Sequence, residues 1–500
     1  MALLSRPECL ISLAVEALVT YVSDLLLRLV TFPQYTATDN RKQRYVEQTC
    51  RRLQEEMYST LPSSLVNEVT AKLLYCINKT YSDVYYSVYR QWGDEVLPMV
   101  LSAILHPALT RLESVEDLSH TVECHEFMWD RLFLNIHGMI HGFPNLKVLK
   151  YGYIRRTEEW TISDINVSEN LEHFWFLELC NDKFLENVAA KCHRLKSIDV
   201  SNSSNVTDQS IQHFLKFEHL EGLNISFTGI SECGLARLMA GLSQAKVCHS
   251  GCRTTFRSFG SNQITSFQID TLASEFQNLT TVSLCPKDES SFSPLKKLKH
   301  LSRMTLSSME FDQVEDLLFT IGTQLVFLEL HYVYNVKISF IGEMCPSVRC
   351  FHLTSGSFLD TEAEFGFLLE SRHRSCSAVF SSVVCLYLDF PRICTEYLVS
   401  ECKQLRKLYV RTGSRSARQL LESVLQRNQL TQLEKYHWGT CTKTGGDVIV
   451  SRPTEESVCV SVVDPFQRSK ILLRTEEVFL FRDQQDSSTD TANPGPRDLH

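Results

Sequence analysis

A phrase of the form Leu-x-x-Leu-x-Leu returns along most of the chain, with mainly polar residues between the apolar ones. Successive phrases are mostly 22 to 25 residues apart, with two longer steps of 59 and 35 residues. A fixed period in this range is typical of a stack of similar supersecondary units that share one core. The phrases open at Leu146, Leu171, Leu195, Leu220, Leu279, Leu301, Leu325, Val348, Val383, Leu405 and Leu430.

Each phrase predicts a short strand. In the third phrase Leu195, Ile198 and Val200 alternate with polar residues, so they are expected to face the core while Ser197, Asp199 and Ser201 face outward. Thr207 or Asp208 follows and can cap a helix that starts just after it. Between phrases the apolar spacing changes to i, i+3, i+4 and i+7, which is typical of a helix with one buried face. Such stripes are Leu235, Leu238, Met239 and Leu242, then Val314, Leu317, Leu318 and Ile321, then Ala417, Leu420, Leu421 and Val424.

A cysteine precedes several phrases, at Cys192, Cys345 and Cys402. Together with the strand and helix pattern, this resembles the cysteine-containing class of leucine-rich repeats, common in F-box-type substrate receptors. The resemblance implies an α/β leucine-rich-repeat solenoid, or horseshoe. Solenoids need their open ends covered, so a helical N-terminal cap is expected.

Four regions follow. Residues 1–140 are predicted to form the helical cap with a candidate adaptor-binding box, and 141–440 the solenoid. Residues 441–482 are predicted to be a C-terminal cap with strands at Val458–Val463 and Val478–Phe481, and 483–500 a disordered tail. The two long steps predict insertions at 250–268, with one degenerate repeat near Ile264–Ile269, and at 360–377.

Composition narrows the class of function. The net charge is −9 with no basic run, which argues against nucleic acid or an anionic membrane as partner. None of the 18 cysteines forms a Cys-x-x-Cys pair, and Cys180, Cys285, Cys350 and Cys385 occupy apolar positions of repeats, so reduced, buried thiols are expected. No run approaches the ~18 apolar residues of a membrane span, and the first 30 residues do not resemble a signal peptide. A location in the cytoplasm, in the nucleus or in both is consistent with these features.

Catalytic motifs are absent from the sequence: it has no Gly-rich phosphate loop, no Gly-x-Ser-x-Gly and no His-Glu-x-x-His. Possible ligand pairs at Cys248–Cys252, Cys124 and His125, and His137 and His141 have no second pair at zinc-site spacing. We therefore expect that the protein is not an enzyme and that it binds no cofactor and no metal.

An apolar stripe opens the chain: Leu10, Ala14 and Leu18 lie on one face of a predicted helix, which Tyr21 and Leu25 continue. It resembles the first helix of the VHL-type box in leucine-rich-repeat substrate receptors, including PRAME-like ones. The resemblance implies that Leu10, Ala14 and Leu18 dock on Elongin-C. The family usually has cysteine where this chain has Ala14.

A second element, Leu61-Pro62-Ser-Ser-Leu65, follows about fifty residues later. In the VHL-type family such an element lies where the receptor approaches a cullin, which implies that role for Leu61, Pro62 and Leu65. The same phrase can open an F-box, which would dock on a Skp-type adaptor. Both the stripe at the start of the chain and this second element can equally belong to the core face of capping helices.

Outward positions on the last strands predict where a partner protein binds, because strands about 4.8 Å apart make neighbouring side chains one patch. Tyrosine and arginine are typical interface anchors. Alignment of the last repeats predicts a central row of Glu329, His352, Tyr387, Tyr409 and Glu434. It predicts flanking rows of Phe327, Cys350, Cys385, Lys407 and Gln432, and of His331, Thr354, Asp389, Arg411 and Tyr436.

The sequence thus indicates a protein-interaction module. Its most specific expected role is substrate recognition in a cullin-RING ubiquitin ligase, with Elongin-B/C or a Skp-type adaptor at the N-terminal helices and an unknown protein target on the concave face. The alternative is a leucine-rich-repeat scaffold with no ligase connection. A receptor should expose the face of Leu10, Ala14 and Leu18, whereas a scaffold should bury it against the first repeats.

Overall fold

The structure is a computed structural model. It describes residues 7–30, 40–85, 90–113, 143–151, 167–177, 180–248, 256–287, 289–354, 380–389, 398–399, 401–411, 435–439, 447–451 and 459–463. The predicted insertion at 360–377, the strand at Val478–Phe481, the tail at 483–500 and the stripe from Ala417 to Val424 lie outside these residues. So do the cysteine and histidine pairs at 124–125 and at 137 and 141.

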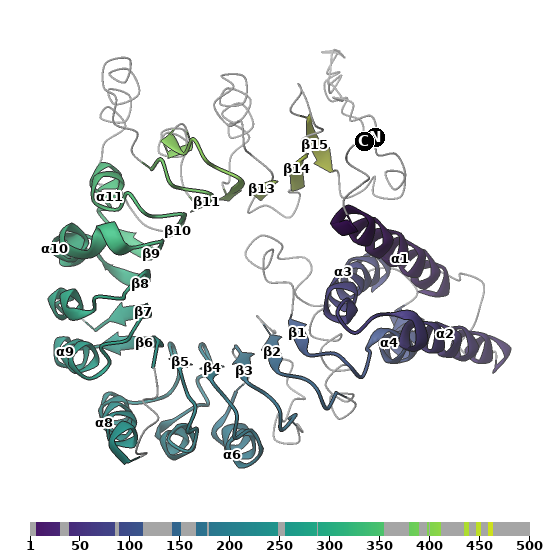
Figure 1. The fold of residues 1–500 in the computed structure, drawn as a ribbon, viewed down its shortest axis with the longest axis horizontal. Coiled ribbons are helices and arrows are strands. Elements are labelled where there is room, and N and C mark those ends of the chain that lie inside the picture. Colours follow the sequence, from purple (N-terminus) through teal and green to yellow (C-terminus); the bar gives the residue numbers. More distant parts are fainter. Residues whose placement is uncertain are drawn as a thin grey trace, which may run out of the picture.

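One 13-stranded sheet dominates the described residues. Its strands follow one another in sequence order, and every neighbouring pair is parallel. The strands line the inner side of an open curve (Figure 1). They are β1 (Arg111–Glu113), β2 (Val148–Tyr151), β3 (His173–Phe176), β4 (Ser197–Asp199), β5 (Gly222–Asn224), β6 (Ser258–Ile264), β7 (Thr281–Pro286), β8 (Arg303–Glu310), β9 (Phe327–Tyr334), β10 (Cys350–Thr354), β11 (Cys385–Asp389), β12 (Lys407–Arg411) and β13 (Lys435–Gly439).

Helical segments connect the strands on the outer side of the curve (Figure 1). They are α6 (Asp182–Lys191), η5 (Asp208–Ser210), α7 (Ile211–Phe214), α8 (Glu232–Cys248), α9 (Ser266–Glu275), η6 (Ser293–Lys297), α10 (Asp312–Ile321), η7 (Gly322–Gln324) and α11 (Ile338–Met344). The predicted helical stripes on α8 and α10 are confirmed, because their apolar residues are buried or half-buried. The predicted mixed α/β class is therefore confirmed.

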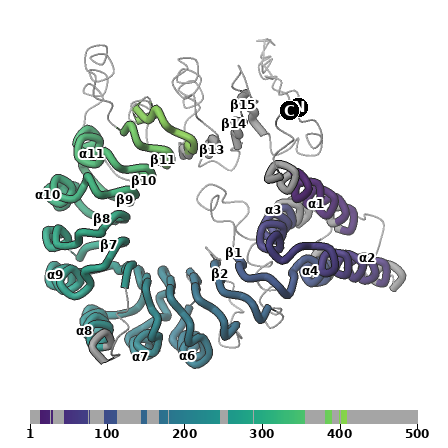
Figure 2. The backbone as a smooth tube through the Cα atoms, viewed as in Figure 1, coloured from purple at the N-terminus to yellow at the C-terminus, as the bar shows by residue number. Residues whose placement is uncertain are grey.

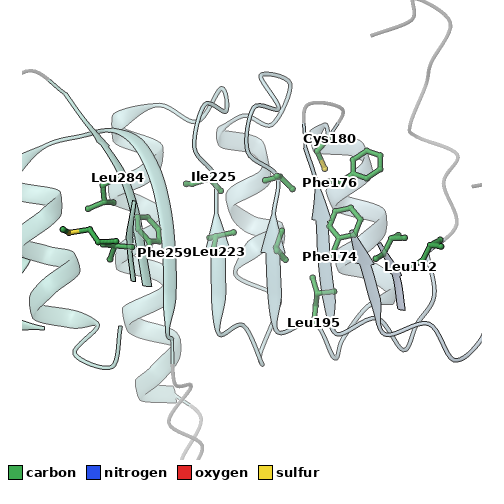
Figure 3. Packing of buried hydrophobic residues seen from close by; sticks show 14 of the residues in the cluster. Leu112, Phe174, Phe176, Cys180, Leu195, Leu223, Ile225, Phe259 and Leu284 are labelled. Atoms are coloured by element: carbon green, nitrogen blue, oxygen red, sulfur yellow. The ribbon is translucent and has the colours of Figure 1, made fainter. Parts of the chain in front are cut away.

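The core lies between the sheet and the helices and forms one connected cluster. Leu195, Ile198 and Val200 are fully buried in it, as predicted from the alternation. Phe174 and Phe176 stack against each other near Cys180 and face the same layer (Figure 3). Leucines and phenylalanines from each repeat thus cover those of the next, so no repeat buries its apolar face alone.

Four helices precede the sheet: α1 (Pro7–Val30), α2 (Asn40–Thr60), α3 (Val66–Tyr85) and α4 (Arg90–Ile104). They lie together at the β1 end of the curve (Figure 2), and their buried residues belong to the same core cluster. Asn67 of α3 accepts hydrogen bonds from the backbone N–H groups of Thr110 (3.0 Å) and Arg111 (3.1 Å). Edge strands leave such groups unpaired, so α3 pairs two of them at the open edge of the sheet. No helix in the described part of the chain is both long and apolar enough to span a membrane.

The structure differs from the sequence prediction at three strands. β1 joins the sheet from within the range 1–140. β6 and the start of α9 occupy most of the predicted 250–268 insertion, because Phe256 and Phe259 take the places of leucines in a full repeat and are buried. β13 starts at Lys435, so the last phrase opens three residues later than Leu430 predicts. Beyond it, β14 (Asp447–Ser451) pairs antiparallel with β15 (Cys459–Val463), which matches the predicted strand at Val458–Val463.

Aspartates tie consecutive repeats together. Asp182 accepts hydrogen bonds from the backbone N–H and the hydroxyl of Thr207, at 2.8 and 2.6 Å. One repeat further on, Asp208 accepts from the backbone N–H and the hydroxyl of Ser231, at 2.8 and 2.7 Å. Thr207 also caps its own helix by accepting from the N–H of Gln209, as predicted. These hydrogen bonds fix the spacing of the repeats at their helical ends.

Replacing Gly234 with alanine should lower the free energy of unfolding by about 2 kcal/mol, because the new Cβ would lie 1.9 Å from Oδ1 of Asp208. The Asp208 side chain would have to move, and its hydrogen bonds with Ser231 would be lost. Gly241→Ala is the matched control on the same helix. Its Cβ would meet only the end of the flexible Leu215 side chain, so its stability should change by less than about 0.5 kcal/mol. Urea denaturation of both variants tests this; equal midpoints would contradict it.

Candidate protein-binding surfaces

One row of residues runs across the inner face of the whole sheet. Its members are Cα partners from strand to strand. From β3 to β11 they alternate with buried core residues, so they face away from the helices. The row is Glu113, Lys150, Trp175, Asp199, Asn224, Gly260, Ser283, Thr305, Glu329, His352, Tyr387, Tyr409 and His437. Aromatic and charged residues occupy the two ends of the row, and small residues occupy its middle.

A carboxylate with two imidazoles lies on this face, across β8, β9 and β10. Oε1 of Glu329 lies 3.0 Å from Nε2 of His331 and 3.3 Å from Nδ1 of His352. Its other oxygen, Oε2, accepts a hydrogen bond of 3.0 Å from the hydroxyl of Thr305. His331 in turn bonds through Nδ1 to the hydroxyl of Thr354. We call these five residues the Glu329 cluster.

Electrostatics in the Glu329 cluster favour the ionised acid. Burial alone would raise the pKa of Glu329, but the hydrogen bonds and electrostatic interactions with His331 and His352 outweigh it. The pKa of Glu329 is therefore held well below its ordinary value. The carboxylate stays charged at neutral pH while its side chain is only 20% exposed.

Aromatic rings surround the Glu329 cluster on one side. The guanidinium of Arg303 lies 4.4 Å from the ring centroid of Phe327. Phe327 meets His352 edge-on with centroids 5.1 Å apart, and His352 lies 5.7 Å from Tyr387. Rings of this kind combine apolar area with polar edges, which suits them to contact with another protein.

The register of the predicted rows is confirmed over four strands. Glu329, His352, Tyr387 and Tyr409 are direct partners, as predicted. The fifth member is wrong. Because β13 starts later than expected, the partner of Tyr409 is His437 and not Glu434.

The flanking rows need the same correction at β13. Lys407 pairs with Lys435 and not with Gln432, and Arg411 pairs with Gly439 and not with Tyr436. In the other flanking row, His331 pairs with Thr354, and Thr354 pairs with Asp389, as predicted.

Side chains in the predicted rows differ in accessibility. Tyr387 is only 9% exposed, so most of its ring is already covered. His331, His352 and Thr354 are half-buried and reachable. The backbones of Asp389, Tyr409 and Arg411 are described, whereas their side chains lie outside the described set.

Sequence reasoning missed Arg303 and Thr305, because only the last repeats were aligned. The phrase at Leu301 carries both at outward positions, so extending the alignment by one repeat would have found them. It also missed Trp175, whose Nε1 donates to the hydroxyl of Ser197 at 3.2 Å and whose ring lies 3.3 Å from Nζ of Lys150. Among the described residues, no group of three or more His, Cys, Asp and Glu is placed to hold a metal ion.

The predicted adaptor stripe on α1 does not coincide with one face. Ala14 is exposed, and Leu18 is half-buried against the core; the side chain of Leu10 lies outside the described set. The buried face consists instead of Val15, Val19, Val22 and Leu29. Four apolar residues point outward on the opposite side, namely Leu13, Ala14, Ala17 and Tyr21. We call these four the outer face of α1.

The second predicted element connects α2 to α3. Leu61 and Leu65 are half-buried and pack against the core, whereas Pro62 is exposed. The backbone N–H of Leu65 donates to the carbonyl of Pro62 at 2.9 Å, which forms the turn that starts α3. This turn also brings Asn67 to the edge of β1.

Comparison with known proteins identifies no family. No family model matches the chain, and no curated protein matches it. Among solved structures, an internalin from Listeria monocytogenes is similar at 12% sequence identity and a TM-score of 0.29, over 61% of this chain and 78% of that one. A likeness of this size transfers neither a fold nor a function to this chain.

Proposed function

We propose that the chain is a leucine-rich-repeat solenoid that binds proteins, and that it serves as the substrate receptor of a cullin-RING ubiquitin ligase. In this proposal the helices α1–α4 cap the solenoid and dock on Elongin-B/C, while the inner face of the sheet holds the target. The observation that carries the proposal is the outer face of α1. The Leu-x-x-Leu-x-Leu phrases and their parallel strands support the repeat class.

α1 is apolar on two sides. Val15, Val19 and Val22 are buried, so that face already has a structural role. On the other side, Leu13 is 54% and Tyr21 60% exposed. A row of exposed apolar residues on a helix normally marks a partner site.

The inner face supports the target-binding role. Around the Glu329 cluster it presents half-buried polar groups beside the rings of Phe327, His352 and Tyr387. The cluster is held by hydrogen bonds across three strands, so it is in place before a partner arrives. Preorganisation of this kind lowers the entropic cost of binding.

The proposed receptor catalyses nothing itself. It would hold the target near the ubiquitin-transfer subunits, and tethering raises the local concentration of the two reacting groups. Leu61, Pro62 and Leu65 would lie toward the cullin, and the exposed Pro62 is the member of this set open to contact. The chain would act in the cytoplasm or nucleus, where these subunits operate.

A scaffold with no ligase connection is the second candidate. It is favoured by the contact of Asn67 with the β1 edge and by the buried valines of α1, because both give the N-terminal helices a structural task. That task alone does not account for the outer face of α1.

Co-expression of the full chain with Elongin-B/C, and separately with a Skp-type adaptor, tests the proposal. We expect a complex with Elongin-B/C that stays together through size exclusion, and none with the Skp-type adaptor. A complex with the Skp-type adaptor alone would favour the F-box alternative. A folded chain that binds neither would leave the scaffold.

A further inference from the structure

Two cysteines face each other on the inner side of the sheet. Cys350 of β10 and Cys385 of β11 are direct partners in the register, and their side chains form a hydrogen bond. Both are half-buried, so the inner surface gives access to them. The expectation that they occupy apolar core positions is wrong, because both precede the core residues Phe351 and Leu386 and so point to the opposite face.

Backbone hydrogen bonds hold the two cysteines in place. The N–H of Cys350 donates to the carbonyl of Val326 at 3.2 Å, and the N–H of Cys385 donates to the carbonyl of Arg349 at 3.0 Å. Neighbouring strands lie about 4.8 Å apart. The Cα atoms of a disulfide are usually about 4.4–6.8 Å apart, so the strand spacing lies within the range that a disulfide spans.

Cys350 differs chemically from the core thiols. Burial raises the pKa of Cys192 and of Cys345 to about 12, which leaves them protonated and unreactive. The hydrogen bond from Cys385 lowers the pKa of Cys350 to about 6 against the opposing effect of burial, and the charges of His352, Arg303 and Arg349 lower it further. The thiolate form of Cys350 is therefore favoured relative to the core thiols, and the thiolate is the nucleophile.

We propose that Cys350 and Cys385 form a dithiol site that reacts with small-molecule disulfides and closes to an intramolecular disulfide. The Cys350 thiolate attacks one sulfur of the small disulfide, so that a mixed disulfide forms and the first small thiolate leaves. Cys385 then loses its proton and attacks Sγ of Cys350, which releases the second small thiolate. Two protein thiols are oxidised, one small disulfide is reduced to two thiols, and the two released protons go to the leaving thiolates.

The dithiol site lies in the proposed target-binding face. Cys350 pairs with Phe327 on its other side, and Phe327 contacts His352 of the Glu329 cluster. The chemistry does not depend on the proposed function, because it needs only the two thiols and a small disulfide.

Treatment of the full chain with cystamine at pH 7, followed by intact-mass measurement and peptide mapping, tests the site. In the wild-type chain, the peptides that contain Cys350 and Cys385 should be linked and together have lost two hydrogen atoms. Cys385→Ser should stop at one cysteamine adduct on Cys350. Cys350→Ser should form neither the link nor an adduct on Cys385 in the same time.

The rate at which Cys350 of the wild-type chain reacts with cystamine is a second measurement, which needs no variants. The lowered pKa raises the thiolate fraction of Cys350 by more than it lowers the nucleophilicity of the thiolate, so Cys350 should react faster than an unperturbed thiol. The unstructured peptide 346–354 is the reference. Slower reaction than in this peptide, faster modification of the exposed Cys233, or a persistent adduct in the wild-type chain would overturn the proposal.

Discussion

Replacing Glu329 with glutamine is expected to lower the free energy of local unfolding around β8–β10 by about 2 kcal/mol at pH 7. The carboxylate accepts from Thr305 and contacts both His331 and His352. Glutamine has nearly the same shape but no charge, and its NH2 group cannot accept a hydrogen bond. The two imidazoles would therefore lose a shared charged partner in a half-buried place.

The loss should depend on pH in one direction. The pKa of Glu329 is lowered in the folded chain from an ordinary value of 4.5. Its contribution to stability is therefore fully present above pH 4.5 and declines as the pH falls below that value toward the folded pKa. The difference between wild type and Glu329→Gln should accordingly be complete above pH 4.5 and shrink as the pH falls below that value.

Amide hydrogen exchange over β9 and β10, at pH 7 and below pH 4, measures this difference. Glu310→Gln is the matched control: Glu310 lies on β8 and is exposed, and it accepts from Asn335 at 2.8 Å. We expect less than about 0.5 kcal/mol for the control, because exposed polar contacts contribute little. An equal loss in both variants, or a Glu329 effect that persists unchanged in acid, would contradict the account.

A negative charge on the outer face of α1 should abolish adaptor binding. In the proposal, Ala17→Asp with Tyr21→Asp puts two carboxylates into the apolar groove of Elongin-C. Burying unpaired charges at the centre of an interface typically costs several kcal/mol, so the affinity should fall at least about a hundredfold. Folding should be unaffected, because Ala17 and Tyr21 are exposed in the free chain.

Tyr45→Asp is the matched control for the α1 variant. Tyr45 lies on α2 and is 55% exposed, close to the 60% of Tyr21, so it receives the same substitution outside the proposed contact. Titration calorimetry with purified Elongin-B/C should give wild-type affinity for this control. Equal affinities for wild type, control and α1 variant would remove the outer face of α1 from the proposal.

Most strands could be predicted because each carries alternating apolar residues in a fixed phrase. β6 was misplaced because Phe256 and Phe259 stand where leucine marks the other repeats. β13 was misaligned because both Leu430 and Leu433 can open a phrase, and only pairing with β12 decides between them. Register within a sheet depends on the neighbouring strand, which a local pattern does not contain.

The candidate surfaces were predicted less completely. The outward positions on β9–β11 could be predicted by aligning the repeats. The burial of Tyr387 and the contacts of Glu329 could not, because they depend on side chains of neighbouring strands. On α1 the apolar residues repeat at helical spacing on two sides, so periodicity alone could not tell the buried side from the exposed one. Packing against the neighbouring helices decides it: Val15, Val19 and Val22 face the core and Leu13 faces outward.

Amide hydrogen exchange of the full chain, with and without Elongin-B/C, tests the central claim most directly because it locates the contact. The proposal predicts slower exchange in α1, centred on residues 13–21, and in the turn at 61–65, with no change in β8–β11. Unchanged exchange throughout the chain, or protection confined to the inner face of the sheet, would contradict a receptor that docks on its adaptor through α1.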